Sequence, residues 1–292
     1  MIETIAYLGP DGTFTQEATQ FLFTNPKAEL VPYPTIPDVF LSIEQGISDY
    51  GVVPVENTIE GSVNVTIDWL IHHVEQPIVG ELIYPIKQCL LVHPKHADRP
   101  ASDFKQVLSH PQAIAQCQMF LHQRFPKAKL VNMDSTAKAA ETLSKRIDQP
   151  LLAIGPEQAA KKHGLHIMQT DIQDHENNYT RFIVVGKKPV VFSHKELGYK
   201  SSIQVTLASD FPGALHQVLA VFAWRKINLT RIESRPTKTG LGNYFFIIDA
   251  EISADHVLMK GALAELEALG CSVRLLGSYP CYEKKLSKKV EL

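Results

Sequence analysis

Residues 5–22 read IAYLGPDGTFTQEATQFL, a stretch that sets the fold class of the N-terminal part of the chain. Its first half is an apolar run typical of a buried strand, and a helical pattern begins at Thr13 after a Gly-Pro turn. The same alternation returns with the run around Val31 and residues 36–45, and the apolar run YGVVPV follows at residues 50–55. Repeated strand–helix alternation predicts βα units on a mostly parallel sheet.

A second α/β series follows the apolar segment at residues 78–92. Three strand-like runs each precede a helical stretch: QVLS before 111–124, KLVN before 135–146 and LLAI before 156–163. The run RFIVVG at residues 181–186 closes the region and is free to return to the first series. We therefore expect two lobes around a cleft, with ligands bound beyond the carboxyl ends of strands.

The pattern changes after Lys187-Lys188-Pro189 and a polar run that ends near residue 200, so we place a domain boundary there. Strands are expected next at residues 201–209, 227–233, 244–251 and 273–277, and helices at 213–225 and 255–269. The order βαββαβ over about 80 residues is the ferredoxin-like motif. The sequence thus predicts a two-lobed α/β domain over 1–190, an α+β ferredoxin-like domain over 200–280, and a solvated lysine-rich tail over 281–292.

The composition argues against several classes of function. The formal net charge of -2 shows no basic excess, so neither nucleic acid nor a membrane surface is indicated as a partner. No apolar run approaches about 18 residues, the length that indicates a membrane span, and the opening run does not resemble a signal peptide. The four cysteines lack C-x-x-C spacing, which indicates reduced thiols in a cytoplasmic protein.

Metal, nucleotide and hydrolase chemistry are not indicated either. The twelve histidines, including His72-His73 and the pair His93 and His96, have no cysteine or carboxylate partner at ligand spacing. The chain lacks the G-x-S-x-G elbow of serine hydrolases, and its Gly-rich turn is neither G-x-G-x-x-G nor a P-loop. We expect no metal and no cofactor.

Two polar segments follow strands and are each open to two interpretations. Thr13 and Thr15 stand at a helix N-terminus, where free amides and hydroxyls either bind a carboxylate or only cap the helix. Glu56, Asn57 and Thr58 follow the buried run YGVVPV, at the place where α/β folds hold ligands. Taken singly each of these three residues is a common turn former, but as a group they favour a site.

The helix expected after QVLS has an apolar stripe of Ile114, Cys117 and Leu121. Gln116 lies off this stripe by the helical period, so it should face water or the cleft. Ser109 precedes the helix and is expected to cap its free amides.

The segment NNYTRFIVVG places a hydroxyl donor, Thr180, beside a permanent cation, Arg181, at the start of a buried strand. Arginine binds a carboxylate bidentately better than any other side chain. Two interpretations are open: Arg181 binds a substrate carboxylate, or it is an edge-strand arginine paired with an aspartate.

In this order, the segments GPDGTFTQEA, PVENTIEGSV, SHPQAIAQC, DSTAKAA, LLAIGPEQAAKKHGL and NYTRF resemble prephenate dehydratases over about residues 4–186. The C-terminal part resembles the ACT domain attached to these enzymes, through FPGALHQVLAVFAWRKINLTRIESRP and YFFIIDAE. Thr15 and Thr58 stand where the family often has serine. The resemblance implies a periplasmic-binding-protein-like catalytic domain with an ACT regulatory domain, in the monofunctional form, assembled as a homodimer or homotetramer.

The resemblance also implies a lyase that converts prephenate to phenylpyruvate in phenylalanine biosynthesis. Thr180 would then donate to the departing hydroxyl, and Asn57, Ser109 and Gln116 would orient the substrate. We expect Arg181 to anchor the pyruvyl carboxylate, because clamping the carboxylate that leaves as carbon dioxide would stabilise the ground state. Further substrate contacts are expected from Thr13, Thr15, Glu56, Thr58 and Phe182.

Phenylalanine is the effector that the resemblance implies. It should bind at Gly213, Ala214 and Leu215, where the FPGAL turn opens a helix with free amides. The ESRP turn should complete the site with Glu233, Ser234, Arg235 and Pro236. Two other functions stay open from the sequence: an arogenate dehydratase, which uses the same chemistry on the amino analogue, and a non-catalytic amino-acid sensor.

Overall fold

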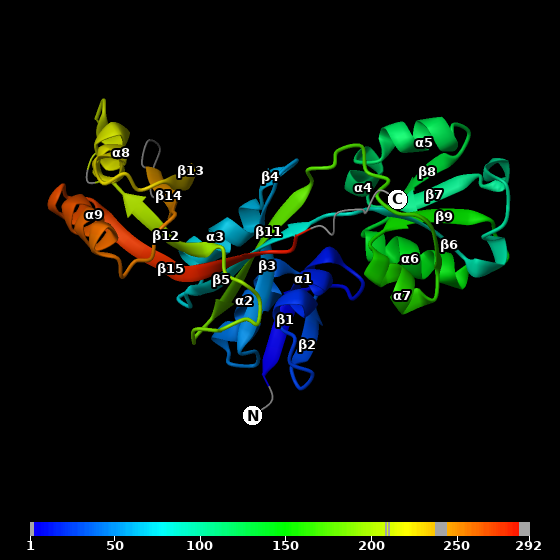
Figure 1. Cartoon of the computed structure of the whole chain (residues 1–292), viewed down its shortest axis with the longest axis horizontal. Coiled ribbons are helices and arrows are strands. Elements are labelled where there is room, and N and C mark those ends of the chain that lie inside the picture. The colour runs from blue at the N-terminus through cyan, green and yellow to red at the C-terminus, as the bar shows by residue number, and fades with distance from the viewer. Residues whose placement is uncertain (1–2, 208, 210, 237–243, 286–292) are drawn as a thin grey trace.

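The computed structural model describes residues 3–207, 209, 211–236 and 244–285, and its elements form two lobes and a C-terminal unit (Figure 1). The first lobe contains β1 (Thr4–Leu8), α1 (Phe14–Leu22), β2 (Glu29–Tyr33), α2 (Ile36–Glu44), β3 (Tyr50–Asn57), β4 (Gly61–Ser62), α3 (Asn64–His72), β5 (Ile78–Pro85) and β11 (Tyr179–Gly186). The second lobe contains β6 (Cys89–Val92), η1 (Pro94–His96), η2 (Ala101–Asp103), β7 (Gln106–Ser109), α4 (Pro111–Ala115), α5 (Gln118–Arg124), β8 (Lys129–Asn132), α6 (Thr136–Lys145), β9 (Leu151–Gly155), α7 (Glu157–His163) and β10 (His166–Gln169). The C-terminal unit contains β12 (Gly198–Thr206), α8 (Ala214–Trp224), β13 (Leu229–Pro236), β14 (Tyr244–Ala250), α9 (Val257–Ala268) and β15 (Ser272–Glu283).

Two sheets organise these elements. The larger has ten strands in the order β13-β14-β12-β15-β5-β11-β3-β1-β2, with β4 paired to β3. The smaller has five strands in the order β10-β6-β9-β7-β8 and forms the second lobe. The expected mostly parallel sheet is instead mixed, because β11 returns from the second lobe and lies antiparallel between β3 and β5.

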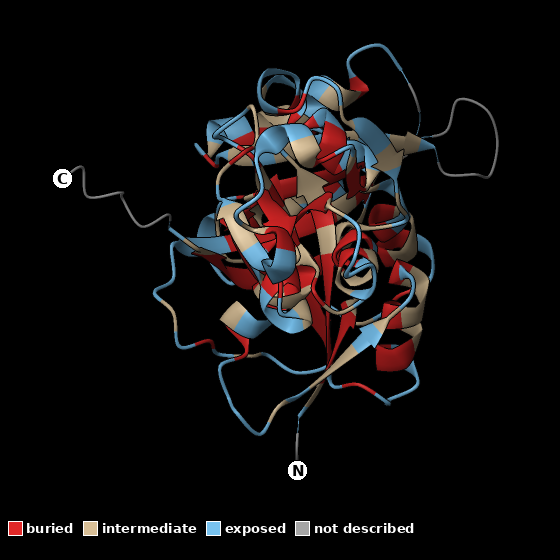
Figure 2. Cartoon of the chain, turned by 90° about the vertical axis from the view of Figure 1, so that its right-hand side faces the viewer, coloured by how far each residue is buried: buried red, intermediate tan, exposed pale blue. Residues whose placement is uncertain are grey.

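The strand β11 is buried on both faces, which explains its continuous apolar sequence. Phe182 and Val184 pack with Ala18 of α1 on one face. Ile183 packs on the other face, in a cluster that includes Phe40 of α2 and residues of the C-terminal unit. Buried strands run through the centre of the lobes, with exposed loops outside them (Figure 2). Among the described residues, no helix is both long enough and apolar enough to cross a bilayer.

The helix expected at residues 111–124 is two helices, α4 and α5, because a residue distant in sequence binds the chain between them. Gln116 ends α4, and its carbonyl accepts from Asp174 N at 2.7 Å. The carboxylate of Asp174 in turn accepts from Met119 N at 3.0 Å and Phe120 N at 3.4 Å. Asp174 therefore caps α5 from outside the helix, and a distant residue of this kind cannot be inferred from helical periodicity.

The last strand is longer than expected and joins the C-terminal unit to the first lobe. β15 pairs with β12 and also runs parallel to β5, with Gly277 opposite Ile78 and Cys281 opposite Glu81. The expected tail at residues 281–292 therefore begins inside β15, and Lys284 Nζ donates to Tyr84 Oη at 2.8 Å. Residues 286–292 of that tail lie outside the described residues.

We predict that Gly277→Ala weakens this joint, because a Cβ at Gly277 would lie 2.3 Å from the backbone oxygen of Ile78. Overpacking of this kind costs about 1–3 kcal/mol. Thermal melting should show the loss. As a matched control, Gly261→Ala in α9 meets only the side chain of Arg225 at 3.4 Å or more, and should leave the melting temperature unchanged or raise it. Equal melting of both variants would contradict a close-packed joint.

Candidate active site

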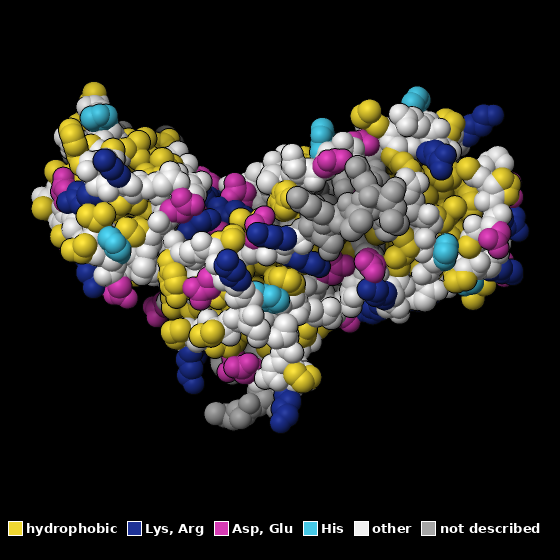
Figure 3. Space-filling view, viewed as in Figure 1, with side chains coloured by type: hydrophobic (Ala, Val, Ile, Leu, Met, Phe, Trp, Pro, Cys, Tyr) yellow, Lys and Arg dark blue, Asp and Glu magenta, His cyan; other side chains and the backbone are white. Residues whose placement is uncertain are grey.

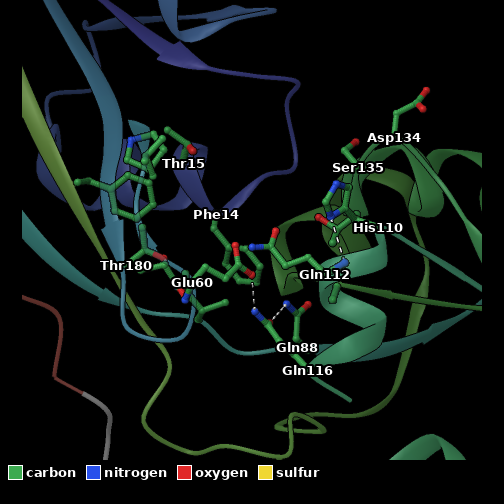
Figure 4. A pocket seen from close by; sticks show the side chains of 17 residues that line it. Phe14, Thr15, Glu60, Gln88, His110, Gln112, Gln116, Asp134, Ser135 and Thr180 are labelled. Carbon is green, nitrogen blue, oxygen red and sulfur yellow. Dashed lines mark hydrogen bonds between the residues drawn. The ribbon is translucent and has the colours of Figure 1, made fainter. Parts of the chain in front are cut away.

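A cavity of about 370 Å³ lies between the two lobes, where the ends of β3 and β11 face the helix starts of the second lobe. Figure 4 shows Thr15 and Thr180 on one side of the cavity and His110, Asp134 and Ser135 on the other. Its lining comes from Phe14, Thr15, Pro54, Asn57, Glu60, Val63, Ile86, Gln88, His110, Gln112, Ala113, Gln116, Asp134, Ser135, Thr136, Thr180 and Phe182. The cleft predicted between two lobes is thus present.

Thr180 and Asn57 meet in this cavity because they are opposite one another in the pairing of β11 with β3. Asn57 Nδ2 donates to Thr180 Oγ1 at 2.9 Å. The orientation of the Asn57 amide is fixed by its oxygen, which accepts from the backbone amides of Ile59 at 2.9 Å and Glu60 at 3.2 Å. Thr180 therefore receives a hydrogen bond, and its own hydroxyl hydrogen is free to point into the cavity.

Gln116 enters the cavity from the end of α4, as its position off the apolar stripe predicts. Its Oε1 accepts from Gln88 Nε2 and from Asn178 Nδ2, both at 3.2 Å, and its Nε2 donates to Glu60 Oε1 at 3.4 Å. Gln116 belongs to the second lobe and Glu60 to the first, so this side chain joins the two lobes across the cavity (Figure 4).

Arg181 does not reach the cavity, and this corrects its expected role as a substrate anchor. Side chains alternate along a strand, so Thr180 and Phe182 face the cavity while Arg181 faces the C-terminal unit. Its guanidinium pairs with Glu56 at 2.7 Å, Glu81 at 2.6 Å and Asp249 at 2.8 Å. Of the two interpretations that the sequence left open, pairing with an aspartate is the one that the structure shows, although β11 is not an edge strand.

The Arg181 cluster, by which we mean Arg181, Glu56, Glu81, Asp249 and Lys200, is largely buried. Glu81 is fully buried and is also paired with Lys200 Nζ at 2.6 Å. Burial alone would lower the pKa of Arg181, but the charges of Glu81 and Asp249 raise that pKa well above its usual range. The guanidinium is therefore permanently charged and committed to these partners.

Four other residues that were expected to contact the substrate do not line the cavity, and each has a side chain that is bonded elsewhere. Thr13 caps α1 by accepting from Gln16 N. Glu56 pairs with Arg181 behind the strand, and Thr58 Oγ1 donates to Asn177 O at 2.9 Å. Ser109 is fully buried at the end of β7 and donates to Ile154 O, so His110 and not Ser109 caps α4. Thr15 and Phe182, by contrast, line the cavity as expected.

Several lining residues were not singled out in the sequence. Gln88, His110, Gln112, Ser135 and Thr136 line the cavity from the second-lobe side. Ser135 is the N-cap of α6 and accepts from Lys138 N at 3.0 Å, a capping signal that the sequence does contain. Glu60 was also not singled out, and burial raises the pKa of its carboxyl, against opposing effects of His110 and Gln116.

The cavity has an unusual electrostatic character for an anion site, since none of its described lining residues is lysine or arginine. Its donors are instead the hydroxyls and free amides at the starts of α1 and α6, which face each other from the two lobes. Helix N-termini stabilise negative charge. Each helix start can therefore stabilise an anionic group, although the carboxyls of Glu60 and Asp134 also line the cavity.

The expected effector residues lie on the C-terminal unit in two places. Gly213 is the N-cap of α8 and has a φ of 97°, a left-handed conformation that favours glycine. The ESRP residues form the end of the edge strand β13, so the expected turn is wrong. Glu233 accepts from Ser62 Oγ at 2.8 Å, and Arg235 donates to Asn64 Oδ1. These two side chains thus contact the first lobe at β4 and the start of α3.

Comparisons with known proteins agree with the division of the chain into a two-lobed part and a C-terminal unit. Residues 5–190 match the family described as prephenate dehydratase, and residues 201–271 match the ACT domain. The prephenate dehydratase of Bacillus subtilis strain 168 is 45% identical over 284 residues, which are 96% of this chain and 99% of that protein.

Two solved structures resemble this chain over nearly its whole length. The prephenate dehydratase of Arthrobacter aurescens in complex with L-Phe superposes with a TM-score of 0.82 at 35% identity, over 94% of this chain and 89% of that one. GqqA, described as a novel type of quorum quenching acylase, has a TM-score of 0.82 at 25% identity, over 96% and 98% of the two chains. On the full-length match, the chain belongs to the prephenate dehydratase family and carries a C-terminal ACT domain.

Proposed function

We propose that this prephenate dehydratase converts prephenate to phenylpyruvate in the cavity between its lobes, with Thr180 as the donor to the departing hydroxyl. Prephenate loses its ring carboxylate as carbon dioxide while the ring hydroxyl departs, and aromatisation drives the reaction forward. Hydroxide is a poor leaving group unless a proton or a strong hydrogen bond reaches it in the transition state. The observation that carries the proposal is the donation from Asn57 to Thr180, which leaves the threonine hydrogen free for the substrate.

The carboxylate of prephenate that leaves as carbon dioxide needs donors that do not neutralise it strongly. A cation on the carboxylate that leaves would stabilise the ground state and slow its loss. The cavity has no described lysine or arginine in its lining, and it offers the starts of α1 and α6 instead. We assign the carboxylates to Thr15 and to Ser135 with Thr136, while Thr180, oriented by Asn57, meets the departing hydroxyl.

A hydrolytic function such as that named for GqqA would require a nucleophile activated by a base. In the described part of the cavity, Ser135 Oγ accepts from Lys138 N and His110 Nδ1 accepts from Gln112 N. Both atoms serve as helix caps, and no hydrogen bond joins the two side chains. No observation favours this second function.

Phenylalanine is proposed as the effector, bound at Gly213–Leu215 and the end of β13. The contacts of Glu233 with Ser62, and of Arg235 with Asn64, support a route from β13 to the cavity. Ser62 pairs with Glu56 in the β3–β4 hairpin, whose loop carries Glu60 into the lining. An effector that shifts β13 would therefore shift Glu60. A homodimer or homotetramer is a proposal that rests on the family resemblance, and a cytoplasmic location is a proposal that rests on the cysteine spacing.

We predict that Thr180→Ala lowers kcat and kcat/KM together by about 100- to 1,000-fold, the usual cost of removing one transition-state donor. The matched control is Thr180→Ser, which keeps the hydroxyl and should retain most of the turnover. Phenylpyruvate absorbance gives both rates, and thermal melting should show both variants folded. Near-normal kcat in folded Thr180→Ala would remove this residue from the mechanism.

We predict that Arg181→Met destabilises the protein and does not act mainly through KM. The substitution leaves the buried carboxylate of Asp249 without its cation and Glu81 with Lys200 alone, and breaking a buried ion pair costs about 3–5 kcal/mol. Denaturant unfolding should show this loss, whereas Arg146→Met at an exposed position should unfold like the parent. A large rise in KM with unchanged stability would instead return Arg181 to the role of substrate anchor.

We predict that Ser62→Ala weakens inhibition by phenylalanine while kcat without effector changes little. The variant removes one link between β13 and the first lobe, and coupling of this kind is worth about 1–3 kcal/mol, or 5-fold or more in the inhibitory concentration. Ser102→Ala, at an exposed site in the second lobe, is the control. Identical inhibition curves for Ser62→Ala and the parent would mean that coupling takes another route.

A further inference from the structure

We propose that Asn178 is a positioning residue that makes the orientation of the Thr180 hydroxyl depend on the arrangement of the two lobes. This inference rests on the proposed role of Thr180. Asn178 lies in the segment that returns from the second lobe to β11, and its side chain is buried, with 1% of the residue exposed. It does not line the cavity itself, and it acts through the side chains that do.

Asn178 governs how Asn57 shares its two amide hydrogens. Three acceptors surround Asn57 Nδ2: Asn178 Oδ1 at 2.9 Å, Tyr179 O at 3.1 Å and Thr180 Oγ1 at 2.9 Å. Asn178 Oδ1 accepts a hydrogen bond from one of these two hydrogens. The other hydrogen is thereby directed toward the Thr180 hydroxyl, which in turn directs its hydrogen to the cavity.

These bonds close into a ring, which we call the amide ring and define as Asn57, Asn178, Gln116 and Glu60. Asn178 Nδ2 donates to Gln116 Oε1 at 3.2 Å, and Gln116 Nε2 donates to Glu60 Oε1 at 3.4 Å. The ring closes through the backbone of Glu60, whose N–H donates to Asn57 Oδ1 at 3.2 Å. Gln116 is the only member from the second lobe, so the ring is complete only when the lobes meet as they do here.

The direction of every bond in the amide ring is set at one point. A backbone N–H can only donate, so the amides of Ile59 and Glu60 fix the oxygen end of Asn57. Asn57 must then donate to Asn178, Asn178 must donate to Gln116, and Gln116 must present its own N–H to Glu60. A change in the hydrogen-bonding type of one member therefore forces its neighbours to turn.

This directionality gives a sharp test. Asn178→Asp still accepts from Asn57 but has no hydrogen for Gln116, so the Gln116 amide must turn its nitrogen toward Asp. Gln116 then presents an oxygen to the carboxylate of Glu60, which is repulsive. Gln88 does not oppose this turn, because its Oε1 is buried without a partner and can accept from Gln116 after a rotation.

A second substitution should relieve the conflict. Glu60→Gln in the Asn178→Asp background supplies an N–H to the turned Gln116 and rebuilds the amide ring with reversed polarity on that side. The control is Asn177→Asp, which makes the same chemical change at the adjacent exposed residue, whose side chain is outside the ring.

The experiment measures kcat and KM for prephenate, together with melting temperature, in the full-length parent, Asn178→Asp, Glu60→Gln, the double variant and Asn177→Asp. We expect Asn178→Asp to lose about 10- to 100-fold in kcat with a smaller change in KM, since misplacement of a catalytic group by about 1 Å costs up to that much. The double variant should recover at least 3-fold in kcat, and part of the melting temperature, relative to Asn178→Asp. Asn177→Asp should behave as the parent.

Three outcomes would overturn the proposal: a kcat of Asn178→Asp within about twofold of the parent, equal losses in Asn178→Asp and Asn177→Asp, or additive effects of Asn178→Asp and Glu60→Gln in both kcat and melting temperature. Failure of the proposed function would give a different experimental result. In that case the parent itself forms no phenylpyruvate, and the non-additivity in melting temperature still decides whether the amide ring exists.

Discussion

The position of β11 between β3 and β5 is the constraint on which the rest of the structure depends. Its register places Thr180 opposite Asn57 and Arg181 opposite Glu56. Because side chains alternate along a strand, the first pair faces the cavity and the second faces the ACT domain. Two adjacent residues of one strand thus serve two units of the protein, and any shift of β11 would be felt on both faces.

The Arg181 cluster makes this arrangement specific as well as stable. Two cations and three carboxylates meet behind the cavity, with Glu81 fully buried and Asp249 nearly so. A buried carboxylate without its cation is costly, so the ACT domain can dock only where Asp249 meets Arg181. On the face shown in Figure 3, exposed basic and acidic side chains are interspersed.

Much of the fold was predictable, because helix caps and apolar periods are local signals. Thr13 and Ser135 begin helices as their types predict, and β11 returns to the first lobe as expected. The predictions that were wrong depended on residues distant in sequence. Asp174 caps α5 and so separates it from α4, and pairing with β5 extends β15 to Glu283. The predicted role of Arg181 was wrong, although strand alternation alone shows that Arg181 cannot share a face with Thr180. Only the identity of its partners, Asp249 and Glu81, required the structure.

The central claim is that the cavity beside Thr180 is the site of prephenate turnover, not merely a ligand site. The most direct measurement mixes the purified full-length protein with prephenate, or separately with arogenate, and follows phenylpyruvate and phenylalanine. The account predicts steady formation of phenylpyruvate from prephenate. Turnover of arogenate alone would contradict the substrate assignment, and binding of prephenate without product would show that the cavity is a sensor.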